Sequence, residues 1–222
     1  MFAGHIGAAL AIGRLDRDVG LGSLIAASLF IDLLLWSFIL LGWESVAIPE
    51  NFTDTHQPAF IFPFSHSLSA AIIWSTLAGA VAFLWYSERK GLSLRAVFMI
   101  SVAVLSHWLL DFTVHNSQIP LLAGTSFKVG LGLWDNMTLA LLFESFIMLA
   151  GLYLFLDGAN TSLPKKIALS ILCLLILSFT IIGMTIAPPP PSAMAMAQSS
   201  IIMIVIICAL AGWLGKENQD SR

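Results

Sequence analysis

The chain has 222 residues, of which 58% are hydrophobic and 10% are charged, and its mean hydropathy is +0.91. A water-soluble domain of this length does not need so apolar a composition, which instead predicts an integral membrane protein. The net charge of −3 is too small to indicate binding to nucleic acid. The two cysteines, Cys173 and Cys208, fall in apolar stretches and predict no disulfide.

The first segment, residues 1–13, is apolar and ends before Arg14. It lacks the basic start and the small-residue cleavage site of a signal peptide, so we expect it to remain in the mature protein. It is shorter than the roughly 20 residues that a helix needs to cross a membrane. We therefore predict a half-length helix held inside the bundle.

Longer apolar stretches follow, and each is long enough to cross the hydrocarbon core. We predict spans over residues 21–41, 67–86, 94–114, 136–156, 167–186 and 199–215. The predicted fold class is an all-α, polytopic transmembrane helix bundle with a short amino-terminal helix. It forms one membrane domain over residues 1–222, in which residues 157–222 add two further transmembrane helices to those of residues 1–156.

Two connecting segments have a distinct composition. Residues 42–66 are acidic and aromatic and contain several prolines, which predicts a loop. The proline run at residues 188–191 and the Ser-Ala-Met-Ala-Met-Ala that follows it predict a short extended linker.

The basic residues predict how the bundle is oriented. Most of them fall on alternate loops, at Arg14, Arg17, Arg89, Lys90, Arg95, Lys165, Lys166, Lys216 and Arg222. The opposite loops hold only Lys128, so the positive-inside rule predicts that the first set is cytoplasmic. Residues 42–66, 116–135 and the proline run then face outward. We expect a bacterial inner membrane, with the site described next toward the periplasmic side.

An unusual group of ionisable residues closes the span over residues 94–114. His107, Asp111 and His115 are spaced four residues apart, so they share one face of a helix. An imidazole and a carboxylate one turn apart can bind one metal ion together. The alternative is a buried His–Asp hydrogen bond that ties two helices together.

Other ionisable residues are predicted at the same depth, from the middle of the membrane to its outer interface. They come from different segments and are His5, Asp32, His66 and Glu144. Each has a simpler explanation, such as a buried polar contact for Asp32, a helix start for His66 or a hydrogen bond to a neighbouring helix for Glu144. Together they predict a functional site, because ionisable groups at this depth are costly unless they are paired, metallated or hydrated.

These residues carry a resemblance to a known family. The motifs are Gly4-His5-Ile6-Gly7, Asp32, Ser65-His66-Ser67 and Ser106-His107-Trp108-Leu109-Leu110-Asp111. Over about residues 1–150 the chain resembles the YdjM-type (LexA-regulated) predicted membrane-bound metal-dependent hydrolases, which are distantly like zinc-dependent phospholipase C. The resemblance implies the ligand set His5, Asp32, His66, His107 and Asp111. The soluble relatives have a further His-x-x-x-Glu helix, but Ala140 stands four residues before Glu144, so one or two metals are implied rather than three.

The predicted chemistry is hydrolysis of a lipid or lipid-linked phosphoester. A divalent ion, most consistent with zinc, polarises a phosphoryl or carbonyl oxygen and activates a water molecule. Asp32, His66, His107 and Asp111 are the expected direct ligands. Glu144, His115 and His5 are candidates for orienting a ligand, for acting as a general base or for binding a second metal.

Two other classes of function remain open at this point. An ion- or proton-coupled transporter also uses intramembrane Asp, Glu and His, although the chain has no inverted repeat and its polar residues thin out toward the cytoplasmic side. An assembly factor with a bound metal and no turnover is the third. The pattern specifies neither the head group of a lipid substrate nor the oligomeric state.

Overall fold

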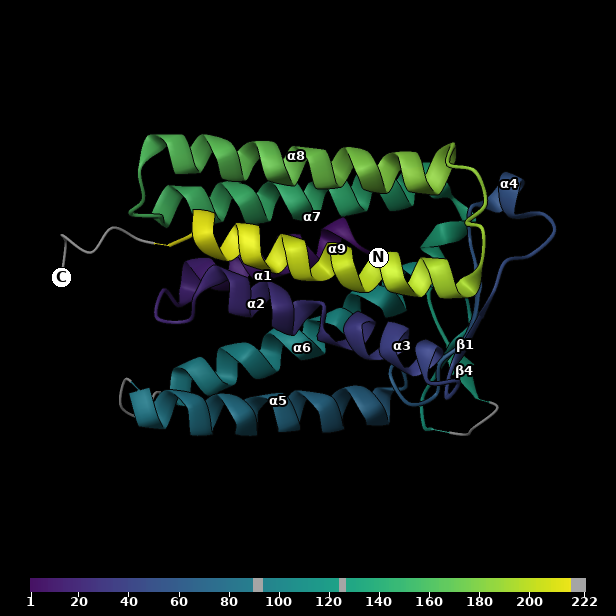
Figure 1. Ribbon diagram of the computed structural model, residues 1–222, viewed down its shortest axis with the longest axis horizontal. Coiled ribbons are helices and arrows are strands. Elements are labelled where there is room, and N and C mark those ends of the chain that lie inside the picture. The colour runs from purple at the N-terminus through teal and green to yellow at the C-terminus, as the bar shows by residue number, and fades with distance from the viewer. Residues whose placement is uncertain (90–93, 124–126, 217–222) are drawn as a thin grey trace.

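The computed structural model describes residues 1–89, 94–123 and 127–216, and the predicted cytoplasmic residues Lys90 and Arg222 lie outside these ranges. The chain folds into a bundle of helices whose axes follow the long axis of the molecule (Figure 1). The longer helices are α1 (Ala3–Leu15), α2 (Leu21–Ser28), α3 (Phe30–Leu40), α5 (Leu68–Arg89), α6 (Leu94–Val114), α7 (Met137–Gly158), α8 (Leu163–Thr185) and α9 (Ala193–Leu214). The all-α prediction is confirmed.

The helices α5 to α9 are each long and apolar enough to cross a membrane, and the bent pair α2–α3 could provide a further crossing. Large apolar side chains cover the outside of these helices, including Ile72 and Leu77 on α5 and Phe146 on α7. Such a surface is suited to lipid and not to water. The chain is an integral membrane protein.

The single span predicted over residues 21–41 is wrong in one respect, because the structure breaks it at Leu29. The two pieces, α2 and α3, meet at an angle of 54°. Ser28 lies at the break, where its hydroxyl donates to the Ile25 carbonyl at 3.0 Å, and such a bond competes with the helical ladder and bends helices. The break also frees the Ser28 carbonyl, which accepts a hydrogen bond from His107 Nδ1 at 2.7 Å.

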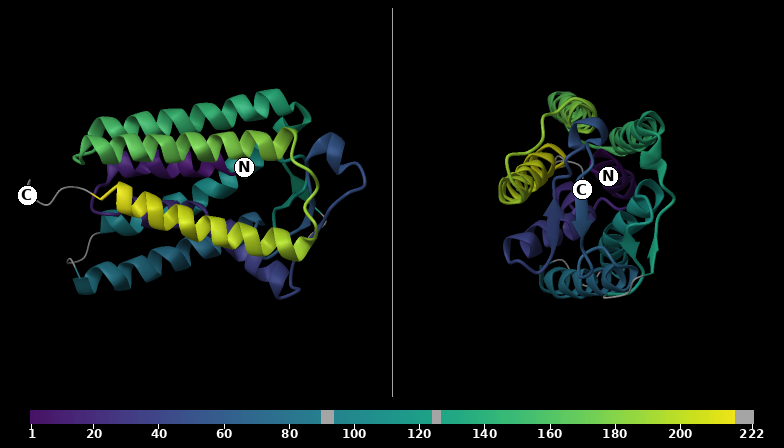
Figure 2. Two further views of the ribbon diagram at one scale, coloured as in Figure 1. Left: turned by 45° about the horizontal axis from the view of Figure 1, so that its top comes forward. Right: turned by 90° about the vertical axis from the view of Figure 1, so that its right-hand side faces the viewer.

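The half-length helix α1 lies inside the bundle, with the other helices arranged around it (Figure 2). Most of its residues are buried, and it packs most extensively against α7. The two helices approach closely at a pair of glycines. A Cβ atom on Gly7 would fall 2.5 Å from the Ile147 carbonyl oxygen, and one on Gly151 would clash with the Gly7 carbonyl. The predicted half-length helix therefore depends on glycine for its position.

The extended linker predicted before the last span is too long. The non-helical segment covers only residues 186–192, and α9 begins at Ala193. Ser192 caps the helix, because its hydroxyl accepts from the Ala195 amide at 3.1 Å. The alanines and methionines that follow are strong helix formers, so they continue the helix and do not extend the linker.

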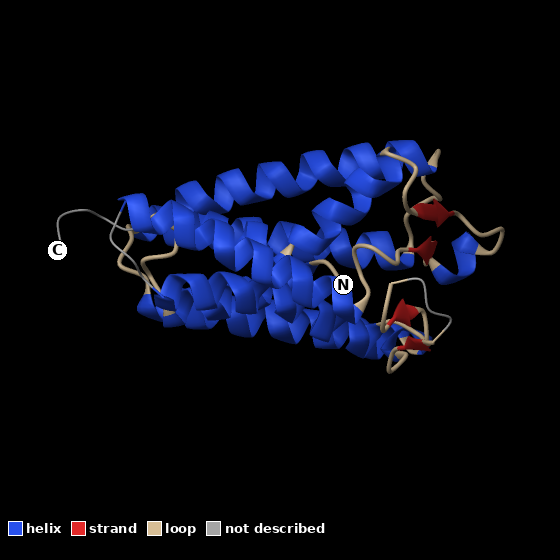
Figure 3. Cartoon of the chain, turned by 90° about the horizontal axis from the view of Figure 1, so that it is seen from below, coloured by secondary structure: helices blue, strands red, loops and turns tan. Residues whose placement is uncertain are grey.

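Short elements close the end of the bundle where α3 and α6 finish (Figure 3). They are the antiparallel pairs β1 (Ser45–Ala47) with β2 (Ala59–Ile61) and β3 (Ile119–Pro120) with β4 (Lys128–Val129), the short helix α4 (Phe52–Thr55) and the 3-10 turn η1 (Leu133–Asp135). Gln57 Nε2 donates to the Trp134 carbonyl at 3.2 Å and joins the two groups. Residues 42–66 are thus more ordered than the predicted loop.

The close approach of α1 and α7 gives a stability prediction. Gly151→Ala should lower the free energy of unfolding by about 1–3 kcal/mol, because the new methyl group meets a backbone carbonyl that cannot move aside. Gly183→Ala in α8 is the control, since a Cβ atom there meets nothing within 4 Å. Unfolding in detergent micelles measures both, and equal stability of the two variants would contradict the packing described.

Candidate metal centre

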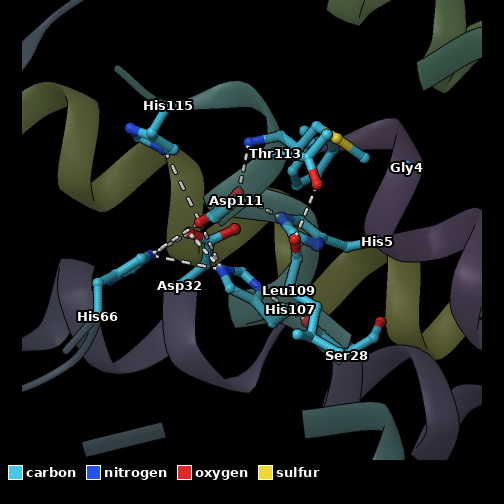
Figure 4. A network of polar contacts seen from close by, with 12 residues as sticks. Gly4, His5, Ser28, Asp32, His66, His107, Leu109, Asp111, Thr113 and His115 are labelled. Atoms are coloured by element: carbon cyan, nitrogen blue, oxygen red, sulfur yellow. Dashed lines mark hydrogen bonds and ion pairs between the residues drawn. The ribbon is translucent and has the colours of Figure 1, made fainter. Parts of the chain in front are cut away.

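The structure brings together all the residues that the sequence implied as ligands (Figure 4). They come from α1, from α3, from the segment immediately before α5 and from α6, and are His5, Asp32, His66, His107 and Asp111. All are buried except Asp32, whose side chain is 18% exposed. Segments far apart in the sequence therefore converge on one point in the bundle.

The distances between the donor atoms match those around one metal ion. His107 Nε2 lies 3.2 Å from Asp111 Oδ2, 3.7 Å from Asp32 Oδ1 and 3.4 Å from His66 Nε2. His66 Nε2 lies 3.4 Å from Asp111 Oδ2 and 3.7 Å from Asp32 Oδ1. Four ligands at 2.0–2.2 Å in a tetrahedron lie about 3.3–3.6 Å from one another. His66, His107 and Asp111 form one group whose donor atoms all lie close enough to hold an ion, and Asp32 Oδ1 lies 3.7 Å from both imidazoles.

His5 belongs to the cluster through the other oxygen of Asp111. Its Nε2 lies 3.2 Å from Asp111 Oδ1, and its ring stacks on the His107 ring with the centroids 3.7 Å apart. His5, Asp32 and His107 form a second group of donor atoms close enough to hold an ion. His107 is common to both groups, and its Nδ1 is bonded to Ser28. Since only Nε2 remains, the geometry favours one shared ion over two separate ones.

Hydrogen bonds fix the orientation of both central imidazoles. The Ser28 carbonyl accepts from His107 Nδ1, which leaves Nε2 free to face the cluster. His66 Nδ1 lies 2.8 Å from Ser65 Oγ, which in turn donates to Glu44 Oε2 at 2.7 Å. Histidines that bind metals are oriented in this way by an acceptor on their second nitrogen.

Three groups beside the cluster are not predicted by the sequence, namely Glu44, Ser28 and the Met1 amino group. Glu44 is buried in the segment that was expected to be a loop, and its Oε1 accepts from the amides of Phe64 and Ser65, both at 2.8 Å. The only sequence feature that indicates a partner such as Glu44 is the adjacent polar pair Ser65 and His66. The Met1 amino group lies 3.0 Å from Asp111 Oδ1.

Glu144 and His115, the other predicted site residues, lie beside the cluster in different ways. Glu144 Oε2 accepts from the amides of Phe2 and Gly4 at 3.2 and 3.3 Å, so it anchors the beginning of α1. His115 Nε2 lies 3.8 Å from Asp111 Oδ2. Among the described residues, His115 Nδ1 has no hydrogen-bond partner.

A cavity of about 370 Å³ opens onto the cluster. Its polar end is formed by Asp32, His66, Asp111, His115 and Glu144. The rest is mainly apolar and comes from α3, from the segments at the closed end of the bundle, and from α8 and α9. In the part of the chain that the structure describes, no lysine or arginine lines it.

Comparison of the chain with protein-family models, with curated proteins and with solved structures found no match.

The hydrogen bond between Ser65 and His66 gives a prediction about metal affinity. Ser65→Ala should weaken binding of a divalent ion about 10–100-fold, because His66 loses the group that orients it. Ser145→Ala is the matched control, since its hydroxyl bonds only within α7, to the Leu141 carbonyl. Competition with a chromogenic chelator measures both affinities. Equal affinities would show that Ser65 does not act on the ligand.

Proposed function

We propose that this protein is a membrane-embedded, metal-dependent hydrolase that acts on a lipid or lipid-linked phosphoester. The observation that carries the proposal is the cluster of imidazole and carboxylate donors, spaced closely enough to hold a metal ion, at one end of a largely apolar cavity. The motifs that resemble the YdjM-type hydrolases contribute these same residues, so membership of that family is part of the proposal.

We assign zinc as the ion, because mixed imidazole and carboxylate ligands at this spacing suit it. When bound, zinc supplies a Lewis acid that polarises the phosphoryl oxygen and makes a water molecule nucleophilic at neutral pH. His66, His107, Asp32 and Asp111 hold the ion, and His5 steadies Asp111 through its second oxygen. Buried ligands also keep bulk water away from the reacting atoms.

Hydrolysis requires a proton to move within the site. The water oxygen forms a new bond to phosphorus, the bond from phosphorus to the alcohol oxygen breaks, and the proton released by the water must reach the departing oxygen. His115 lines the cavity beside Asp111, and its Nδ1 is unpartnered among the described residues, so we assign the proton transfer to it. Glu144 is the second candidate, although it already accepts two hydrogen bonds from α1.

The charges around the cavity favour a phosphodiester over a phosphomonoester or a pyrophosphate. Three carboxylates line it, those of Asp32, Asp111 and Glu144, while no described lysine or arginine does and the Met1 amino group is paired with Asp111 at 3.0 Å. One divalent ion therefore leaves little positive charge for a substrate group that carries two negative charges. A diester carries a single negative charge and meets less repulsion.

An ion- or proton-coupled transporter is the rival function, and the broken helix α2–α3 is the feature that favours it. A pathway should continue through the bundle on both sides of the cluster. Toward the Arg14 end of α1, however, the residues around the axis are apolar and almost fully buried, among them Ile6, Leu10, Leu24 and Ile25. This apolar layer supports a closed site over a pathway.

The direct test replaces two of the ligands. His107→Ala and Asp111→Asn should each abolish stoichiometric zinc and hydrolysis of a phosphodiester lipid, and the double variant should be little worse than either single one because the residues act together. Elemental analysis and a product assay measure the two effects. If a chelator leaves all activity of the parent protein intact, the hydrolase proposal fails and the transporter gains support.

The same assay separates binding from turnover. His115→Gln should retain zinc and lose most of the hydrolysis, by about 100-fold or more if His115 transfers the proton. Loss of zinc in this variant would make His115 a ligand and not a proton carrier. Glu144→Gln keeps an oxygen that can accept the amide hydrogen bonds of α1, so a similar loss there would assign the proton transfer to Glu144.

The proposal also includes an orientation, which follows from the basic residues: the loop of residues 42–66 faces the periplasm of a bacterial cell, and the connection between α7 and α8 faces the cytoplasm. Asn51 and Ser162 are both exposed and directly precede α4 and α8, and α4 lies at the end of the bundle opposite the connection between α7 and α8 (Figure 1). We expect a membrane-impermeant maleimide added to intact cells to label Asn51→Cys but not Ser162→Cys. The opposite pattern would turn the site toward the cytoplasm.

A further inference from the structure

The cavity beside the cluster is lined on one side by the outer halves of α8 and α9, the two helices that the ligand motifs do not include. Four residues of α8 take part, from Phe179 to Met184, and so do residues of α9 from Met196 to Ile204. The cavity thus extends from the ligands to the boundary between these two helices.

The lining residues indicate that the cavity opens sideways at this boundary. Phe179 and Met203 line the cavity, yet they are 64% and 38% exposed. Gly183 also lines it, and a Cβ atom there would meet nothing within 4 Å. A side chain that borders an internal space and also the outer surface lies at an opening. The views from the side and from the end place α8 and α9 next to each other on the outside of the bundle (Figure 2).

The position of the opening determines what can enter it. Both helices are long and apolar enough to cross a membrane, and large apolar side chains such as Ile182 and Val205 cover their outer faces. The opening therefore faces lipid hydrocarbon and not water. Around it lie flexible methionines, Met184, Met196 and Met203, which adapt to chains of irregular shape. The cavity volume lies within the range of about 300–1,000 Å³ that is usual for small-molecule sites.

We propose that α8 and α9 form a lateral entrance and a binding site for one hydrocarbon chain of the substrate, with the phosphoester at the metal cluster. The inference rests on the proposed hydrolase function and narrows its substrate to diesters that carry a long alkyl or acyl chain. It also assigns a role to the last two helices, because they select the substrate by its chain while the earlier helices hold the ion.

Photolabelling tests the occupant without requiring turnover. The protein is placed in nanodiscs of phosphatidylglycerol, a small part of which carries a diazirine at the end of one acyl chain. Lipid around the bundle can label only exposed residues. A chain inside the cavity should also label Thr180 and Ile204, which are buried and line it. Absence of label on these two residues in the parent protein overturns the proposal.

Variants at the entrance complete the test. Gly183→Trp fills the opening and should remove the label from Ile204, and Ser199→Phe on α9 should act in the same way if the first variant does not fold. Ser178→Trp is the control, because Ser178 is exposed on α8 and does not line the cavity. Zinc content should be the same in all of these variants, since none of the substituted residues contacts a metal-binding side chain.

Turnover distinguishes this inference from the hydrolase proposal. In Gly183→Trp, the ratio of kcat/KM for a long-chain diester to kcat/KM for a water-soluble diester should fall about 10-fold or more, the effect of excluding two methylene groups. If Gly183→Trp hydrolyses both diesters and the ratio of the two kcat/KM values is unchanged, the proposed entrance is wrong and the hydrolase proposal still holds. If the label on Ile204 depends on Gly183 but the parent protein hydrolyses neither diester, the proposed entrance holds and the hydrolase proposal is wrong.

Discussion

The carboxylate of Asp111 makes the contacts on which the centre of the bundle depends. One of its oxygens faces His5 and the Met1 amino group, and the other faces His66, His107 and His115. A charged group is costly at the depth of a membrane, where water cannot solvate it. These contacts compensate for that loss, and those with Met1, His5 and His66 also fix the beginning of α1 and the segment before α5 relative to α6. The electrostatic requirement of one side chain therefore organises the whole inner layer.

The break between α2 and α3 supports the contacts around Asp111, because it provides a hydrogen-bond acceptor for His107. An unbonded carbonyl in a membrane interior costs several kcal/mol, and an uninterrupted helix would use the Ser28 carbonyl in its own ladder. The break exposes that carbonyl, and His107 Nδ1 takes it as acceptor at 2.7 Å. Asp32 then falls in the first turn of α3, beside the same imidazole. One irregularity in the backbone thus positions two of the residues in the cluster.

The sequence predicted the cluster better than it predicted the backbone around it. The spacing of His107, Asp111 and His115 and the estimated depths of Asp32 and His66 depend only on helical geometry, which holds once the spans are known. No proline or glycine in the sequence marks the break at Leu29. The break is stabilised instead by a histidine from a distant helix, which a local pattern does not show. The helix α9 begins earlier than predicted, because the residues that follow the proline run favour a helix.

The partners of the ligands were harder to predict than the ligands themselves. Glu44 reaches Ser65 only because the β1–β2 pair folds the intervening segment back on itself. That pairing involves few residues and has no strong pattern in the sequence. The same is true of the contact between Glu144 and the beginning of α1, which joins residues 140 or more positions apart. Local patterns cannot reveal contacts that depend on the finished bundle.

The short length of α1 has a consequence for how the protein is made. Its 13 residues extend about 20 Å, less than the roughly 30 Å of the hydrocarbon core. It therefore gains its place by packing against α7, whose first residue, Met137, is synthesised long afterwards. The contacts between α1 and α7, the most extensive that α1 makes, can form only after α7 has been synthesised. A chain that stops before α7 lacks these contacts and also lacks the Glu144 carboxylate, which accepts two hydrogen bonds from the beginning of α1.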